Sequence, residues 1–176
     1  MLSIEQLNAL DLAEFVAQLG KIYEHSPWIA ERTWSARPFA SINQLHAAMQ
    51  STVMQATHEE QLGLARAHPE LLGRLVAASE LTETSRREQA GAGLYQCTDE
   101  ELARLRVLNR DYREKFSFPF IVAVRGMTSA DIVARMAERL ENRPEVEFKT
   151  CLDEIGRIAH FRLSELIDDK LVAEKT

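Results

Sequence analysis

The chain has 176 residues, enough to bury a continuous apolar core, and we expect a single domain spanning residues 1–176. Its 21 Lys and Arg residues against 27 Asp and Glu residues give a net charge of −6, which would repel a phosphate backbone, so nucleic acid is not expected as a partner. The longest apolar stretches are far too short to cross a bilayer, and the first residues are too acidic for a signal peptide, so no membrane association is expected. The two cysteines, Cys97 and Cys151, lack CxxC spacing and predict reduced thiols in a cytoplasmic compartment.

The N-terminal part of the chain is predicted to be helical. Apolar residues recur at intervals of three and four from Leu12 to Ile22, which is the period of a helix with one buried face. A second, short helix is expected to begin at Pro27, with Ser26 as its N-cap, and to stop before Pro38.

Ser41 opens a third helical pattern that runs to about Met54, and a further apolar series leads to the pair His68-Pro69. The residue before a proline disfavours the α conformation. We therefore expect His68 at a helix end, where its side chain can point into a pocket.

Two cap signals follow. Thr84 or Ser85 can cap a helix that carries the segment RREQAGAGL, and Thr98 with Glu101 forms a capping box in front of ELARLRVLNRDYREKF.

The segment FPFIVAVRG, residues 118–126, interrupts the helical pattern with Pro119 and a β-branched run, so we expect extended chain or a short turn there. Ser129–Leu140 and Pro144–Ile167 then predict two amphipathic helices. The whole pattern predicts an all-α fold, a single-domain irregular helical bundle.

Several common site motifs are absent. The sequence has no Gly-rich phosphate loop, no HExxH pair, no nucleophile elbow and no Glu-x-x-His pair of the di-metal type. His58 and His68 are poorly spaced to share a metal from one helix face. No metal is expected.

His68 is the first candidate for chemistry, because an imidazole changes its protonation near neutral pH and this one is held before Pro69 and beside Glu70. A helix-terminal histidine that interacts with the last carbonyls is the structural alternative. Glu88 lies in the first turns of a predicted helix, where the helix dipole favours a carboxylate in any case.

Arg162 lies in the segment IAHFRLSEL among apolar neighbours. Its planar guanidinium suits a substrate carboxylate, which it can bind through two parallel hydrogen bonds. An ordinary surface ion pair, with Glu165 or Asp168, is the alternative.

Five segments, in this order, resemble the family of 2-oxo-4-hydroxy-4-carboxy-5-ureidoimidazoline (OHCU) decarboxylases, the last enzymes of the route from urate to (S)-allantoin. The resemblance runs from about Phe15 to Leu166. It rests on FVAQLGKIYEHSPWIAERTWSARPF, ARAHPELLG, SRREQAGAGL, YREKFSFPFIVAVRG and EIGRIAHFRLSEL.

The resemblance implies an all-helical decarboxylase that uses no cofactor, acts on a small anionic molecule and forms a homodimer. It implies that His68 is the acid-base residue, assisted by Glu88 and Arg162, with Arg157 as a second match for the arginine. It also implies a binding set of Pro69, Ser85, Arg86, Arg87, Glu88, Gln89, Phe120, Ile121, Val122, Ala123, Val124 and Arg162.

Two readings from other classes stay open at the level of sequence. A helical binding module could hold a ureide or purine metabolite in the same pocket without turning it over. A purely structural helical dimer explains the apolar faces, but it gives no reason for the ordered His, Ser-Glu-Gln and Arg motifs.

Overall fold

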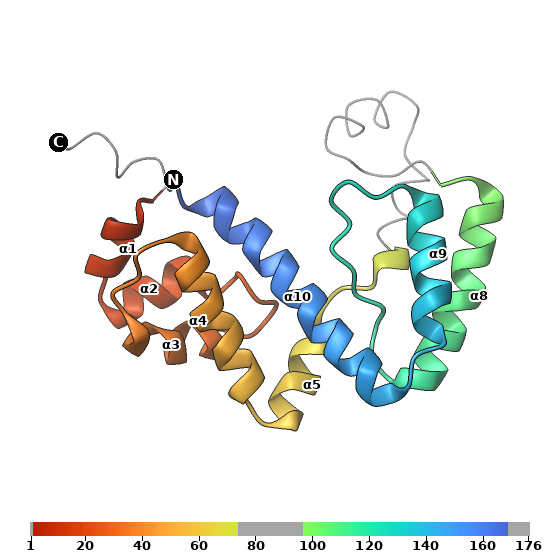
Figure 1. Ribbon diagram of the computed structural model, residues 1–176, viewed down its shortest axis with the longest axis horizontal. Coiled ribbons are helices and arrows are strands. Elements are labelled where there is room, and N and C mark those ends of the chain that lie inside the picture. Colours follow the sequence, from red (N-terminus) through yellow and green to blue (C-terminus); the bar gives the residue numbers. More distant parts are fainter. Residues whose placement is uncertain (1, 74–96, 169–176) are drawn as a thin grey trace. The chain divides into compact units, whose positions relative to one another are not determined.

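The computed structural model describes residues 2–73 and 97–168, and within them it confirms the predicted all-α fold, with no β-strand. No helix in these described residues is long and apolar enough to cross a membrane. The α-helices, labelled in Figure 1, are α1 (Ile4–Ala9), α2 (Leu12–Leu19), α3 (Trp28–Thr33), α4 (Ile42–Gln55), α5 (His58–Ala67), α8 (Asp99–Phe116), α9 (Ser129–Leu140) and α10 (Pro144–Leu166). A 3-10 helix, η1 (Trp34–Ala36), follows α3.

The chain divides into two compact units. Unit 1 consists of residues 1–67 and 153–176, and unit 2 consists of residues 68–152. The long helix α10 is continuous through the division, so its first part belongs to unit 2 and its second part to unit 1. The sequence predicts a single domain over residues 1–176, and this stays a prediction.

Unit 1 is built on short amphipathic helices whose apolar faces meet in a common core. Helix α3 packs against both α2 and α4. Ser3 and Asp11 begin α1 and α2 with capping boxes, which satisfy backbone N–H groups that have no partner inside the helix. Deeply buried side chains of this core include Leu7, Phe15, Leu19, Tyr23, Ile29, Leu45, Met49, Val53, Leu64, Ala159 and Leu163.

The two ends of the described chain are joined inside unit 1. Leu2 and Ile167 form an isolated parallel bridge, in which the Leu2 N–H donates to the Leu166 carbonyl (3.1 Å) and the Asp168 N–H donates to the Leu2 carbonyl (2.9 Å). Leu2 therefore holds the end of α10 through backbone hydrogen bonds, which do not involve its side chain.

Unit 2 contains α8 and α9, which pack against each other, and the start of α10. The predicted capping box of Thr98 and Glu101 begins α8, as expected. The core of unit 2 is rich in aromatic side chains. Tyr112, Phe116, Phe118 and Phe120 are buried, and the Tyr112 ring contacts each of the other three rings.

No helix was predicted at Ile4–Ala9, where the structure has α1. The helix expected to begin at Thr84 or Ser85 lies outside the described residues. The other helices agree closely with the predicted ones except at two places. The helix expected from Leu12 to Ile22 ends at Leu19, although Ile22 is buried. The expected cap of the next helix was wrong: Pro27 is the N-cap of α3, and the Ser26 hydroxyl donates instead to the Glu24 carbonyl (2.9 Å). The chain makes a tight turn here, with His25 at φ 47°, which the apolar period could not reveal.

A pair of histidines joins α4 to the second part of α10. The His46 Nε2 lies 2.8 Å from the Gly156 carbonyl and so donates to it, and the His46 and His160 rings meet edge to face with centroids 4.9 Å apart. Burial lowers the pKa of His46, the bond to Gly156 opposes this shift, and the neighbouring His160 adds to it. The fold therefore favours neutral His46.

We expect this pair to make stability depend on pH. Because the folded pKa lies below the ordinary value of about 6.5, the unfolded chain binds the proton first as the pH falls. The stabilising contribution is complete above about pH 6.5 and is lost as the pH falls toward the folded pKa. The melting temperature should therefore decrease less between pH 7 and pH 5 in His46→Gln than in the unmodified chain. His58→Gln, at an exposed position, is the control. Equal decreases in all three proteins would contradict the assignment.

Candidate functional site

His68 is placed where the sequence predicted, directly after the last residue of α5. Only 7% of the residue is exposed, whereas Pro69 is exposed. A buried imidazole at the end of a helix has its orientation restricted by its surroundings, which is a requirement for directed proton transfer.

The segment after His68 is attached to α8 through Glu70. The Glu70 carboxylate accepts a hydrogen bond from the Arg113 guanidinium and forms an ion pair with it. Both side chains are partly exposed to solvent, at 35% and 56%, so the pair adds little stability. It links the chain immediately after the candidate histidine to α8.

Residues Phe120 to Val124 lie between α8 and α9 and have no regular secondary structure, as the interrupted helical pattern predicted. Phe120, Ile121 and Val122 are buried, and Ala123 and Val124 are half-buried. The segment ends in a turn at Gly126, whose φ of 81° lies in the left-handed region that glycine adopts without strain.

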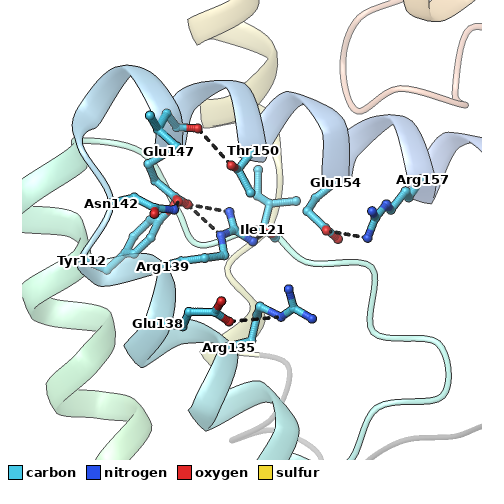
Figure 2. A network of polar contacts seen from close by, with 11 residues as sticks. Tyr112, Ile121, Arg135, Glu138, Arg139, Asn142, Glu147, Thr150, Glu154 and Arg157 are labelled. Atoms are coloured by element: carbon cyan, nitrogen blue, oxygen red, sulfur yellow. Dashed lines mark hydrogen bonds and ion pairs between the residues drawn. The ribbon is translucent and has the colours of Figure 1, made fainter.

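A buried network of polar side chains lies beside this segment, and Figure 2 shows its members. Arg139 on α9 donates through Nε (2.9 Å) and Nη2 (2.6 Å) to Glu147 Oε1 on α10, and through Nη1 to the Ile121 carbonyl (2.7 Å). Tyr112 also donates to Glu147, and Asn142 donates to its second oxygen (2.8 Å). The ion pair is almost fully enclosed, with side-chain exposures of 4% for Arg139 and 0% for Glu147.

The network also determines how its members ionise. Burial raises the pKa of the Tyr112 hydroxyl, and the hydrogen bond to Glu147 and its charge raise it further. Burial disfavours the charged form of Arg139, but the hydrogen bonds and charge of Glu147 outweigh burial, so the pKa of the guanidinium lies above its ordinary value. Arg139 is therefore a permanent cation beside the carbonyl of Ile121.

Arg162 lies on the second part of α10, in unit 1. Its Nη1 donates to the Ile22 carbonyl (2.9 Å), and its Nη2 donates to Glu24 in an ion pair. Neither Glu165 nor Asp168, the partners considered from the sequence, takes this place. A guanidinium carries five N–H donors, so these two bonds do not exhaust it.

Arg157, the second match for the family arginine, has a different environment. Its side chain is 67% exposed and pairs with Glu154 on its own helix (3.0 Å). Arg162 is 32% exposed and is held by residues from another part of the chain. The environment of Arg162 is that of an oriented group, and the environment of Arg157 is that of a surface residue.

The predicted site residues are thus distributed over both units. His68, Pro69 and the segment Phe120–Val124 belong to unit 2, and Arg162 belongs to unit 1. The predicted residues Ser85, Arg86, Arg87, Glu88 and Gln89 lie outside the described residues. In the described part of the chain, no group of three or more His, Cys, Asp or Glu side chains could hold a metal ion.

Sequence reasoning did not find Arg139 and Glu147. A signal was present, since Arg139 continues the series Ile132 and Met136 on the buried face of α9, and Glu147 precedes Cys151 on the buried face of α10. A charged residue in each of two apolar stripes that follow each other in the chain indicates a buried ion pair.

Comparisons with known proteins match this geometry to one family. The profile of the OHCU decarboxylase family matches residues 8–164. A 2-oxo-4-hydroxy-4-carboxy-5-ureidoimidazoline decarboxylase of Haloferax volcanii is 44% identical over 93% of this chain and 95% of its own length. The uric acid degradation bifunctional protein PucL of Bacillus subtilis is 42% identical over 97% of this chain and 34% of its own length.

A solved structure agrees with these relatives. The crystal structure of an (S)-allantoin synthase superposes with a TM-score of 0.77 at 33% identity, over 95% of this chain and 55% of that one. Since a family profile and a relative of nearly equal length both cover almost the whole sequence, the chain belongs to the OHCU decarboxylase family of carboxy-lyases.

Proposed function

We propose that the chain converts 2-oxo-4-hydroxy-4-carboxy-5-ureidoimidazoline to (S)-allantoin in urate degradation, without metal or organic cofactor and with His68 as the acid-base residue. The observation that carries the proposal is the buried position of His68 at the end of α5, in a chain whose family profile spans residues 8–164. We further propose that the enzyme is a cytoplasmic homodimer.

The chemistry of the substrate explains why no cofactor is required. Its carboxylate and a hydroxyl share one ring carbon, which is next to a ring C=N bond. When the bond to the carboxylate breaks, carbon dioxide leaves, its electron pair forms a double bond between the two ring carbons, and the C=N pair moves to the ring nitrogen, which gains a proton. The hydroxyl then loses its proton and becomes a carbonyl as the ring carbon that bears the ureido group gains a proton. The substrate itself supplies the electron sink, so the protein has to orient it and move protons.

The proposal gives each site residue a role. His68 moves the proton, and Glu88 orients either His68 or the substrate hydroxyl. Delivery of the final proton to one face of the ring would give a single enantiomer. The remaining binding contacts come from Pro69, from Ser85 to Gln89 and from the backbone of Phe120 to Val124.

Arg162 is proposed to hold the substrate carboxylate. A tight ion pair stabilises this anion before the reaction, and the charge leaves the carboxylate in the transition state. Arg162 therefore contributes by placement and not by lowering the barrier through its charge. The contacts with Ile22 and Glu24 support this role because they keep the guanidinium in one orientation.

We expect His68→Asn to keep the native helix content and to lose turnover by about a hundredfold to ten-thousandfold, the usual contribution of an acid-base group. The measurement is circular dichroism at a wavelength sensitive to allantoin, with freshly generated substrate and chelator-treated protein. His58→Asn is the matched control, since His58 lies exposed at the start of the same helix. Near-native turnover in His68→Asn would remove His68 from the mechanism. Binding of allantoin by an unmodified chain that does not turn the substrate over would support the binding module instead.

For Arg162→Ala we expect a raised KM and a kcat that changes little, because the ion pair holds the bound substrate and its charge does not lower the barrier. Arg157→Ala should leave both constants unchanged, since Arg157 is exposed on the same helix. The two variants are compared with the unmodified chain by steady-state kinetics, at a temperature where both keep native helix content. An unchanged KM with a large loss of kcat in Arg162→Ala would contradict the placement role.

A further inference from the structure

We propose that Arg139 is a positioning residue for substrate binding, because it fixes the peptide plane in the middle of the Phe120–Val124 segment. The inference rests on the proposed function, in which the backbone of this segment holds the substrate. It adds a residue that lies outside the sequence motifs of the family resemblance, and it assigns a task to the buried network of Figure 2.

The Phe120–Val124 segment requires an external support. Helices and sheets fix the direction of each peptide plane through repeated backbone hydrogen bonds, and residues 119–124 belong to neither. Apolar packing fixes the side chains of Phe120 and Ile121, but it is not directional. A hydrogen bond to a peptide carbonyl is directional, and Arg139 makes one to the Ile121 carbonyl at 2.7 Å.

The consequence of this bond reaches the next amide. The peptide between Ile121 and Val122 is planar and trans, so the Val122 N–H points opposite to the Ile121 carbonyl. Holding the carbonyl toward Arg139 therefore aims the Val122 N–H away from Arg139. We assign this N–H as a donor to the amide or ureido oxygens of the substrate.

Arg139 is itself held by two groups, the Glu147 carboxylate and the Phe120 ring, which makes it a rigid support. Glu147 accepts from its Nε and Nη2, and the guanidinium lies over the Phe120 ring, 4.6 Å from the centroid. The planar guanidinium donates to the Glu147 carboxylate and to the Ile121 carbonyl at the same time, through different nitrogens. A lysine retains the charge but has one compact ammonium group and cannot reproduce this geometry.

A role confined to stability makes a different prediction. If the network only held α8, α9 and α10 together, any change in it would lower the melting temperature, and the substrate affinity of the folded enzyme would stay constant. Tyr112 allows the two roles to be separated. Its hydroxyl donates to Glu147, whereas the bond to the Ile121 carbonyl comes from Arg139.

The test compares four variants in steady-state kinetics, each at a temperature where it keeps native helix content. In Arg139→Lys we expect KM to rise by roughly tenfold or more, the usual effect of losing one hydrogen bond from a charged group, with kcat within about threefold. Tyr112→Phe should lower the melting temperature and keep the KM of the unmodified chain. Arg135→Met, at an exposed position on the same helix, should change neither.

The double variant Arg139→Met with Glu147→Met covers the case in which Arg139→Lys does not fold. Replacing both charges by apolar groups of similar length leaves no unpaired buried charge, so the core can tolerate the change. This variant lacks the bond to Ile121, and its KM should rise as in Arg139→Lys.

A second readout follows the Val122 amide itself by NMR. Addition of allantoin should shift the Val122 amide signal of the unmodified chain, and hydrogen exchange at this amide should be roughly tenfold or more faster in Arg139→Lys.

If the unmodified chain turns the substrate over but the KM is unchanged in Arg139→Lys or in the double variant, the inference is overturned and the proposed function is not. Absence of turnover by the unmodified chain overturns the proposed function and the inference that rests on it. An equal rise of KM in Tyr112→Phe would show a general effect of stability and would also overturn the inference.

Discussion

The buried ion pair of Arg139 and Glu147 is the interaction on which unit 2 depends. It joins α9 to α10, and through Tyr112 and the Ile121 carbonyl it also joins α8 and the irregular segment to them. Two enclosed charges are costly to remove from water, and loss of one partner from such a pair typically destabilises by about 3–5 kcal/mol. This is a large part of the roughly 5–15 kcal/mol that stabilises an ordinary domain. Loss of the charge of one partner alone is therefore the change that unit 2 tolerates least.

Most of the helices could be predicted because each carries its own local signals. The cap at Thr98, the apolar period of Ser129–Leu140 and Pro144 at the start of α10 all act over a few residues. The two wrong boundaries lie where tertiary contacts determine the backbone. The turn after Leu19 buries Ile22 and Tyr23 against the core, and no local sequence pattern indicates this turn.

The candidate site could be predicted in part. Pro69 placed His68 at a helix end on physical grounds alone, whereas the roles of Ser85 to Gln89 and of Phe120 to Val124 came only from the family resemblance. The sequence does not distinguish Arg162 from Arg157, because both lie on the same helix. The structure shows that they differ in their partners and in their exposure, and the role of Arg162 stays a prediction. Arg139 was not recognised because its partners lie on two other elements, Glu147 on α10 and Phe120 and Ile121 in the irregular segment.

The joining of Leu2 to Ile167 has a consequence for the order of folding during synthesis. Residues 68–152 form one continuous stretch, so all of unit 2 is synthesised before the last part of α10. Unit 1 is completed later, because its core includes Ala159 and Leu163 and because Leu2 bonds to residues 166 and 168 near the end of the described chain. Although domains generally fold from the N-terminus first, here the inserted unit can form before the unit that begins the chain. The exposed apolar faces of α1 to α5 are then the surfaces that a chaperone would have to protect.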